Sequence, residues 1–214
     1  FFYKITDNYT GKFKKMNHFI ICRHCKSVLD GKDSERELDS DGVLQSNSLS
    51  KKIFNLVDES TIIYSSPFKR AIDSLMPLKN DLESIEIRED ESLKEINIGK
   101  SEDLSKHQII EEMWKNKNFK VLNGESQMEC FNKIKPSLDK IFSQYRDEKK
   151  NIILVTHGNL IGIIIKFYFG LNFDFNMWKS ISMPDFYNVT FDEKHKAINF
   201  KRDVENIENL FYVK

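Results

Sequence analysis

The apolar run at residues 151–155, Asn-Ile-Ile-Leu-Val, is the feature that most constrains the fold of this 214-residue chain. Its apolar side chains are nearly continuous rather than alternating, which is typical of a parallel strand buried on both faces. Residues 18–22 form a second short apolar run with the same character. Because such strands need helices on both faces, the pattern predicts a three-layer α/β/α sandwich with a mostly parallel sheet.

Strands and helices alternate along the rest of the chain. Further strands are predicted at residues 61–64, 84–88, 187–191 and 197–202, and helices at residues 43–57, 107–114, 125–145 and 160–169. Another helix should follow Pro67 towards Leu78, with Ser66 as its cap and Pro77 ending or bending it. Since no repeat and no linker rich in proline or glycine divides the chain, we expect residues 16–214 to form a single domain with a small lid at residues 100–123.

The N-terminal segment and the cysteine content bear on processing and location. Residues 1–15 precede Met16, and they lack the apolar core and cleavage site of a signal peptide. We interpret them as an N-terminal extension, with Met16 as the hypothetical native start. Three cysteines are an odd number, which favours a reducing compartment over a disulfide scaffold, so we expect a cytoplasmic protein.

The charge distribution indicates which partners to expect. Lysine plus arginine equals aspartate plus glutamate at 33 each, so a nucleic-acid-coating role is not expected. The most apolar region, residues 152–169, contains His157, Asn159 and Lys166, which a membrane span would not carry at mid-depth. We therefore expect neither a nucleic-acid nor a membrane partner, and the sequence does not predict the oligomeric state.

Three of the predicted strands end in residues that suit a phosphate group. The first ends in Arg23-His24, the second is followed by a serine pair with Arg70 one turn into the next helix, and residues 151–155 are followed by Thr156 and His157. Because the carboxyl ends of parallel strands meet at one edge of the sheet, these residues should form one cluster. Each residue alone would be a weak signal. The prediction of a phosphate site rests on all of them reaching the same edge of the sheet.

Two arginines and two histidines around one point would suit a phosphate dianion. Arginine forks match phosphate oxygens bidentately, and the start of the helix at residue 160 would add backbone donors. Neighbouring arginines also lower the pKa of a histidine, which keeps His24 neutral as a nucleophile must be.

A proton donor for the leaving oxygen should come from the acidic loop at residues 90–103. A partly buried carboxyl beside the phosphate would have a raised pKa, as an acid catalyst near neutral pH requires. The residue types alone do not choose among five candidates, Asp90, Glu91, Glu95, Glu102 and Asp103.

These motifs, taken together, resemble those of the histidine phosphatase superfamily, which includes the cofactor-dependent phosphoglycerate mutases. The resemblance runs in the correct order over residues 17–169. The matching segments are Arg23-His24-Cys25, Gly42-x-x-Gln45, Ser65-Ser66-Pro67-Phe68-Lys69-Arg70-Ala71, Leu93-Lys94-Glu95-Ile96-Asn97-Ile98-Gly99, Gly124-Glu125-Ser126 and Thr156-His157-Gly158.

The resemblance implies a phosphoglycerate mutase-like fold and a role for each matching residue. His24 would attack phosphorus and become a phosphohistidine, while Arg23, Arg70 and His157 would hold the phosphoryl oxygens. Glu95 would protonate the leaving group and then activate water. We add Asn159, close to His157, to the expected substrate-binding residues. The implied enzyme is a metal-independent phosphatase that needs no cofactor and acts on a small phosphorylated substrate.

Cys25 is the departure from this pattern, since the superfamily has glycine there. A side chain would cost about 1 kcal/mol if the position needed a positive φ. Cys22 and Cys25 also have the C-x-x-C spacing of redox motifs and zinc ligands. We expect instead that Cys22 is buried and that Cys25 lies in the pocket wall, with a redox motif and a zinc site as the alternatives.

Two other functions remain open alongside phosphatase. The mutases resembled here carry a much longer insertion between the positions of Glu95 and His157, which favours water as the acceptor in this chain but leaves mutase-type phosphoryl transfer as an alternative. A phospho-ligand-binding module without turnover is the second. In the lid, Trp114, Lys115 and Lys117 are candidates for contact with the leaving group.

Overall fold

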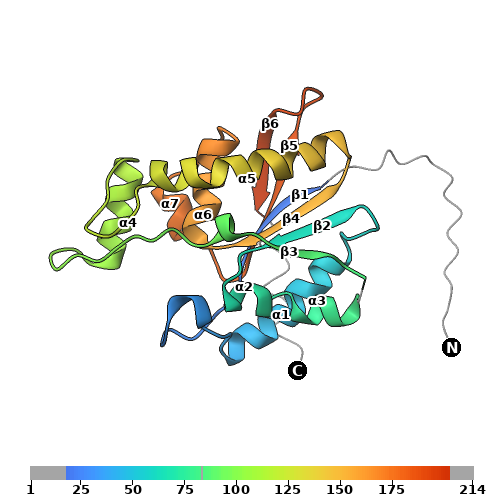
Figure 1. Ribbon diagram of the computed structural model, residues 1–214, viewed down its shortest axis with the longest axis horizontal. Helices are drawn as coiled ribbons and strands as arrows, with labels where there is room; N and C mark the ends of the chain where they lie inside the picture. The colour runs from blue at the N-terminus through green and yellow to red at the C-terminus, as the bar shows by residue number, and fades with distance from the viewer. Residues whose placement is uncertain (1–17, 83, 203–214) are drawn as a thin grey trace, which may run out of the picture.

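Alternate side chains of β1 (Phe19–Arg23) pack on opposite faces of the central sheet. Phe19 and Ile21 belong to one apolar cluster, and Ile20 and Cys22 belong to another. In the computed structural model, which describes residues 18–82 and 84–202, helices cover both faces of this sheet (Figure 1). A strand that is apolar on both faces is therefore buried on both faces, as the sequence predicted.

The sheet has six strands in the order β3-β2-β4-β1-β5-β6. Neighbours among β3, β2, β4 and β1 are parallel, whereas β5 pairs antiparallel with both β1 and β6. This arrangement confirms the predicted α/β/α sandwich with a mostly parallel sheet. The remaining strands are β2 (Thr61–Ser65), β3 (Ile87–Glu89), β4 (Asn151–Thr156), β5 (Asp185–Phe191) and β6 (Ala197–Arg202).

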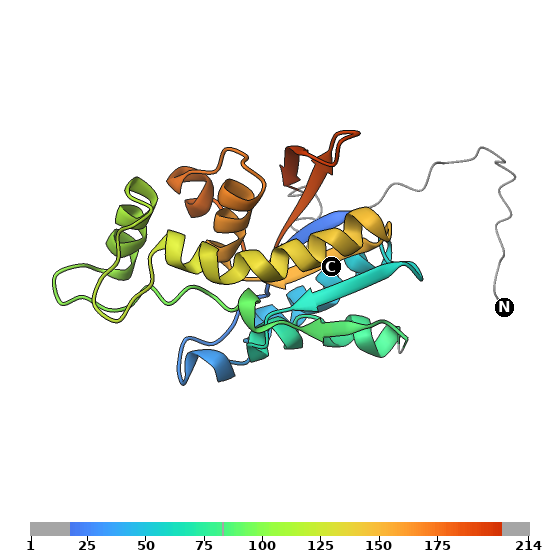
Figure 2. The same ribbon diagram turned by 45° about the horizontal axis from the view of Figure 1, so that its top comes forward.

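Helices α1 to α3 lie on one face of the sheet, and α5 and α6 lie on the other (Figures 1 and 2). No helix in residues 18–82 or 84–202 is long and apolar enough to cross a membrane. The helices are α1 (Ser40–Phe54), α2 (Lys69–Asp73), α3 (Met76–Asp81), α4 (Lys106–Lys115), α5 (Gln127–Asp147), α6 (Gly158–Ile163) and α7 (Phe175–Lys179), with short helices η1 (Asp33–Glu35), η2 (Glu91–Leu93) and the π-helical η3 (Ile164–Tyr168).

The helix predicted after Pro67 differs most from expectation. It begins at Lys69 with Phe68 as its N-cap, and α3 starts only three residues after α2 ends. Pro77 lies in the first turn of α3, where its missing N–H has no helical acceptor, so it helps to start a helix rather than to end one. The sequence also missed α7. The proposed extension at residues 1–15 lies outside the described residues.

The segment predicted as a lid, residues 100–123, contains α4 and lies at one end of the molecule beside α6 and α7 (Figure 2). Its two ends meet at Gly99 and Gly124. A Cβ on Gly99, whose φ is +70°, would lie 2.7 Å from the carbonyl oxygen of Leu122, and one on Gly124 would lie 2.8 Å from that of Ile98. Glycine at both positions therefore lets the two backbones touch.

Candidate active site

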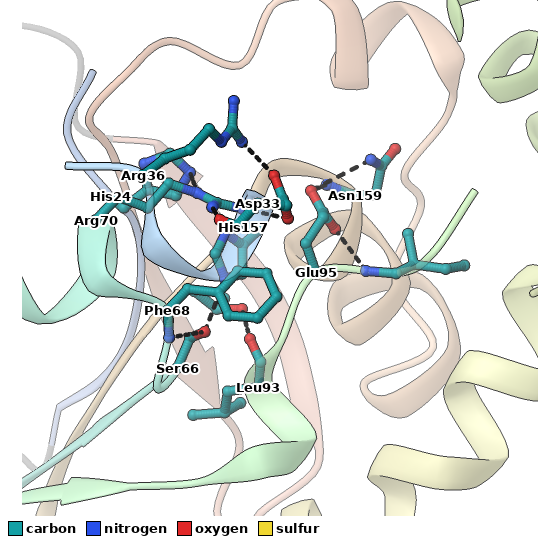
Figure 3. Close-up of polar contacts among 12 residues, drawn as sticks. His24, Asp33, Arg36, Ser66, Phe68, Arg70, Leu93, Glu95, His157 and Asn159 are labelled. Atoms are coloured by element: carbon teal, nitrogen blue, oxygen red, sulfur yellow. Dashed lines mark hydrogen bonds and ion pairs between the residues drawn. The ribbon is translucent and has the colours of Figure 1, made fainter. Parts of the chain in front are cut away.

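His24 and His157 lie side by side because β1 and β4 are parallel neighbours in register. Arg23, the last residue of β1, pairs with Thr156, so the residue after each strand reaches the same edge. The two imidazole ring centroids are 5.0 Å apart. Arg70, in the first turn of α2, reaches the same point and donates from Nε to Nε2 of His24 at 3.1 Å (Figure 3). The predicted convergence of strand ends is thus present in the structure.

The imidazole of His24 is held in a defined tautomer. Its Nδ1 lies 2.6 Å from the carbonyl oxygen of Cys25, which can only accept a hydrogen bond. Nδ1 therefore carries the proton, and the lone pair is on Nε2. Burial, and then the charges of Arg70 and Arg23, lower the pKa of His24 well below its usual value, although the hydrogen bond to Cys25 opposes this. The ring is consequently neutral at neutral pH.

The guanidinium of Arg23 is fixed by the loop before β5. Its Nη1 donates to the carbonyl oxygens of Ile181 and Ser182 at 3.1 and 3.2 Å. The buried carboxylate of Asp185 accepts from the Ser182 amide at 2.9 Å and pairs with Arg202 at 2.6 Å, which fixes that loop. Arg23 is therefore placed by backbone carbonyls and can present its remaining donors to a ligand.

Several buried donors around His24 have no partner among the described residues. They are Nε of Arg23, Nε of Arg36 and Nδ1 of His157. Buried polar atoms are almost always hydrogen-bonded, so unpaired buried nitrogens on these side chains indicate a site for a ligand with acceptor oxygens.

Ser66 orients His157. Its Oγ lies 2.8 Å from Nε2 of His157 and accepts from the amide of Phe68 at 3.3 Å. When the serine hydroxyl donates to His157 Nε2, the proton of the neutral ring is on Nδ1. Burial, followed by the neighbouring His24 and Arg70, keeps the pKa of His157 low and the ring neutral. The sequence interpreted Ser66 as a helix cap, and the structure shows that this was wrong.

Glu95 is the predicted acid that lines the same cavity as His24. Its Oε2 accepts from the backbone amide and from Nδ2 of Asn159 at 3.2 and 3.3 Å, and its Oε1 accepts from the Ile96 amide at 3.0 Å. The hydroxyl of Thr156 donates to the Leu93 carbonyl at 2.7 Å and ties this loop to β4. Burial raises the pKa of Glu95, and the amides of Asn159 and Ile96 oppose that rise.

Asn159 has a role that the sequence did not predict. Its backbone amide belongs to the start of α6, which we expected to face phosphate, but it donates to the Glu95 carboxylate instead. Asn159 still lines the cavity, so its position is compatible with the predicted contact to substrate.

The cavity in front of His24 has a volume of about 830 Å³, and its lining is rich in cations. A smaller hollow of about 470 Å³ adjoins it and adds His107 and Trp178. The charged residues of the larger cavity are Arg23, Asp33, Arg36, Arg70, Glu95, Lys100 and Lys106.

The lid residues that we expected to contact the leaving group do not line the cavity. Trp114 is buried, with its ring against Gly162 and Phe173, and Lys115 pairs with Glu111 and Glu112. Lys100 and Lys106 line the cavity in their place.

The family model described as histidine phosphatase superfamily (branch 1) matches residues 19–203. The chain belongs to this superfamily. No curated protein matches the chain in a sequence search. In this structure, residues that we predicted to be functional meet at the carboxyl edge of the sheet.

Solved histidine phosphatase structures share the fold at low sequence identity. A mycobacterial glucosyl-3-phosphoglycerate phosphatase in complex with inorganic phosphate is 17% identical, with a TM-score of 0.66, covering 89% of this chain and 97% of its own. A phosphoserine phosphatase of Entamoeba histolytica in complex with 3-phosphoglyceric acid is 19% identical, with a TM-score of 0.67, covering 90% and 100%. These likenesses show the phosphoglycerate mutase-like fold of this chain.

Cys25, the departure from the superfamily pattern, packs into the core rather than into the pocket wall. It is fully buried and belongs to the same apolar cluster as Cys22 and Leu49. It is not among the described residues with positive φ, so its side chain adds no backbone strain. Burial raises its pKa to about 12 and also raises that of Cys22, which is opposite to the thiolate character of redox and metal-binding cysteines.

Sequence reasoning missed two charged residues of the site, Asp33 and Arg36. They belong to the loop between β1 and α1, and Nη2 of Arg36 lies 2.6 Å from Oδ1 of Asp33. A polar loop with mixed charges has no periodicity, so only the folded loop shows that these two side chains turn towards Arg70 (Figure 3).

Proposed function

We propose that this protein is a phosphomonoesterase that hydrolyses a small phosphorylated metabolite through a phosphohistidine on His24, with Glu95 as the proton donor. The tautomer of His24 is the observation that carries the proposal. The Cys25 carbonyl holds the proton on Nδ1, so the lone pair of Nε2 faces the guanidinium of Arg70. A phosphate gripped by Arg70 would place its phosphorus in front of this lone pair.

In the first step, Nε2 of His24 forms a bond to phosphorus, and the bond from phosphorus to the leaving oxygen breaks. Arg23, Arg70 and His157 bind the phosphoryl oxygens: Nε of Arg23 and Nδ1 of His157 have no partner among the described residues, and Arg70 lies against His24. Glu95, whose pKa is raised by burial, gives its proton to the leaving oxygen. The leaving group departs as a neutral alcohol, and His24 holds the phosphoryl group.

In the second step, the Glu95 carboxylate takes a proton from water, and the water oxygen attacks phosphorus. The bond between phosphorus and Nε2 breaks, and the electron pair returns to His24 as inorganic phosphate forms. Asn159 and Ile96 hold the carboxylate through both steps by their hydrogen bonds. No step needs a metal ion or a cofactor.

The cations at the cavity wall favour a substrate with a second anionic group on its leaving group. Lys100 and Lys106 line the cavity and form no ion pair within the described residues. Phosphoserine and 3-phosphoglyceric acid, the ligands of two similar structures, both carry a carboxylate besides the phosphate. We propose substrates of this charge type, with Lys100 and Lys106 near the carboxylate.

Phosphate release from p-nitrophenyl phosphate tests the reaction. We expect His24→Ala to abolish release, while His18→Ala, at the opposite end of β1, keeps it. Rapid quench into base should trap a phosphohistidine in the wild type, labile to acid and stable to base, that is absent in His24→Ala. Equal rates for wild type and His24→Ala, or no release from either, would contradict the proposal. The latter result together with phosphate binding would favour a binding module.

The mutase alternative is tested with the same protein. A mutase transfers the phosphoryl group to a hydroxyl of the substrate, whereas a phosphatase transfers it to water. With 3-phosphoglycerate as substrate, we expect free phosphate and no 2-phosphoglycerate. The segment between Glu95 and His157 is short, which leaves the cavity open to water.

A further inference from the structure

We propose that Asp33 is a resident counter-ion of the phosphate site, and that its carboxylate must leave Arg70 when a phosphoryl dianion binds. The inference rests on the proposed function only in placing the phosphoryl group beside His24. Oδ2 of Asp33 lies 3.3 Å from Nη2 of Arg70, and Oδ1 lies 2.6 Å from Nη2 of Arg36. The carboxylate therefore bridges two of the guanidinium groups that line the cavity (Figure 3).

Each nitrogen of the Arg70 guanidinium is already engaged by a protein acceptor. Arg70 is only 2% exposed, and each of its three nitrogen atoms has a partner: Nε donates to His24, Nη1 to the Asp33 carbonyl and Nη2 to the Asp33 carboxylate. A phosphoryl oxygen offers the same acceptor chemistry as a carboxylate oxygen. Phosphate thus competes with Asp33 for the same guanidinium.

Asp33 is the partner that can move. Its side chain is 59% exposed and lies on the short helix η1, so water can solvate the carboxylate once it is released. The loop that carries it is closed at its base by the pairing of Ser27 with Leu38 and by the hydrogen bond from Val28 to Glu37, so rotation of the side chain does not require the loop to unfold.

Glu95, the other acid of the cavity, offers a useful contrast. Backbone amides of two separate segments hold its carboxylate in place. Within the described part of the chain, the Asp33 carboxylate has only side-chain cations as partners. Glu95 is therefore fixed for proton transfer, whereas Asp33 is held by the arginine side chains to which the phosphoryl group would bind.

Two roles for Asp33 predict opposite effects of its removal. If the carboxylate competes with phosphate, its neutralisation strengthens binding of the dianion. If it serves instead to position Arg36 and Arg70, its neutralisation releases their side chains and weakens binding. The sign of the change separates the two roles.

The test is calorimetric titration of the full chain with inorganic phosphate and with orthovanadate. We expect Asp33→Asn to bind both about three- to tenfold more tightly than the wild type, since partly exposed ion pairs of this kind are individually modest. Glu35→Gln is the matched control, because Glu35 lies on the same turn but pairs with Lys32 at 2.7 Å. It should change binding less than twofold.

Unchanged or weaker binding by Asp33→Asn would overturn the proposal, as would equal tightening by Glu35→Gln, which would indicate a general charge effect. Asp33→Ser, with thermal melting of each variant, guards against a defect peculiar to asparagine. The titration needs no turnover, so its outcome can be read even if the chain proves to hydrolyse no phosphomonoester.

Discussion

Arg70 donates from Nε directly to Nε2 of His24, the atom proposed to attack phosphorus, at 3.1 Å. The proposed phosphate-binding group and the proposed nucleophile are thus in contact before substrate arrives. The same guanidinium helps to keep the pKa of His24 low, after burial. In the proposed mechanism, one side chain would both bind the phosphoryl group and keep the imidazole neutral.

Arg70→Lys tests whether the planar fork is needed rather than the charge alone. Lysine supplies a point charge and cannot bond His24 and a phosphoryl oxygen in the same plane. We expect kcat/KM for p-nitrophenyl phosphate to fall by about 100-fold, since hydrogen bonds to charged groups contribute about 1.5–3 kcal/mol each. Circular dichroism and thermal melting serve as the folding control. A loss of less than threefold would show that charge alone suffices.

Glu95→Gln tests the role of the acid through the leaving group. An alkyl phosphate such as phosphoserine expels a poor leaving group that needs a proton, whereas p-nitrophenolate leaves readily without one. We expect kcat/KM to fall by about 100-fold or more for phosphoserine, in the range typical of general acid catalysis. The loss for p-nitrophenyl phosphate should be much smaller. Equal losses for both substrates would assign Glu95 a role in binding instead.

The pH profile of kcat/KM should be bell-shaped, with an acid limb set by His24 and an alkaline limb set by Glu95. Burial and the two arginines lower the pKa of His24, so the ring stays neutral below the usual histidine value of 6.5, and the acid limb lies below that pH. Burial raises the pKa of Glu95 above its usual 4.5, so the alkaline limb lies above that pH. Glu95→Gln should remove the alkaline limb. A wild-type profile still rising above pH 8 would contradict the assignment.

The sequence predicted the parts of the site that depend on strand ends. Arg23, His24 and His157 follow directly from two buried parallel strands, and parallel pairing alone brings such residues to one edge. Arg70 follows because the helix after β2 begins at Lys69, within two residues of the predicted start. The positions of these four residues are set by strands and helices, and apolar runs in the sequence predict where those strands and helices lie.

The residues that sequence reasoning missed depend on irregular backbone. Ser66 faces His157 because the chain stays extended until Phe68, so its hydroxyl is not at a cap position. Asp33 and Arg36 meet Arg70 through a loop whose path no periodic pattern specifies. Cys25 packs in the core, and its φ is not positive, neither of which the residue type alone could reveal.

Cys25→Gly, which restores the superfamily residue, should lower stability and leave activity nearly unchanged. The cysteine is fully buried, and its amide is held by Ser74 Oγ at 2.8 Å, so its backbone is already in place for the bond to His24. Loss of the side chain and greater backbone freedom should reduce the free energy of unfolding by about 1–2 kcal/mol. Urea denaturation measures this, with Cys25→Ala as the control for backbone freedom. A large gain in kcat/KM on restoring glycine would mean that the thiol strains the site.

Gly162→Ala tests how α4 is held against the rest of the domain. A Cβ on Gly162 in α6 would lie 2.7 Å from Cη2 of Trp114 and 2.8 Å from Cε1 of Phe173, so the alanine must displace the indole. Overpacking of this kind costs about 1–3 kcal/mol. Since Trp114 is 8% exposed in the native structure, its displacement should shift its fluorescence to longer wavelength.

The measurement is made in a Trp178→Phe background, which leaves Trp114 as the only tryptophan of the chain. Gly170→Ala is the control: its φ of +67° makes the alanine strained, but nothing lies within 4 Å of the added Cβ. It should lower stability without changing the emission. If Gly162→Ala moves α4, the KM for phosphoserine should rise as Lys106, the first residue of α4, leaves the cavity wall. A red-shifted emission with an unchanged KM would separate the packing of α4 from substrate binding.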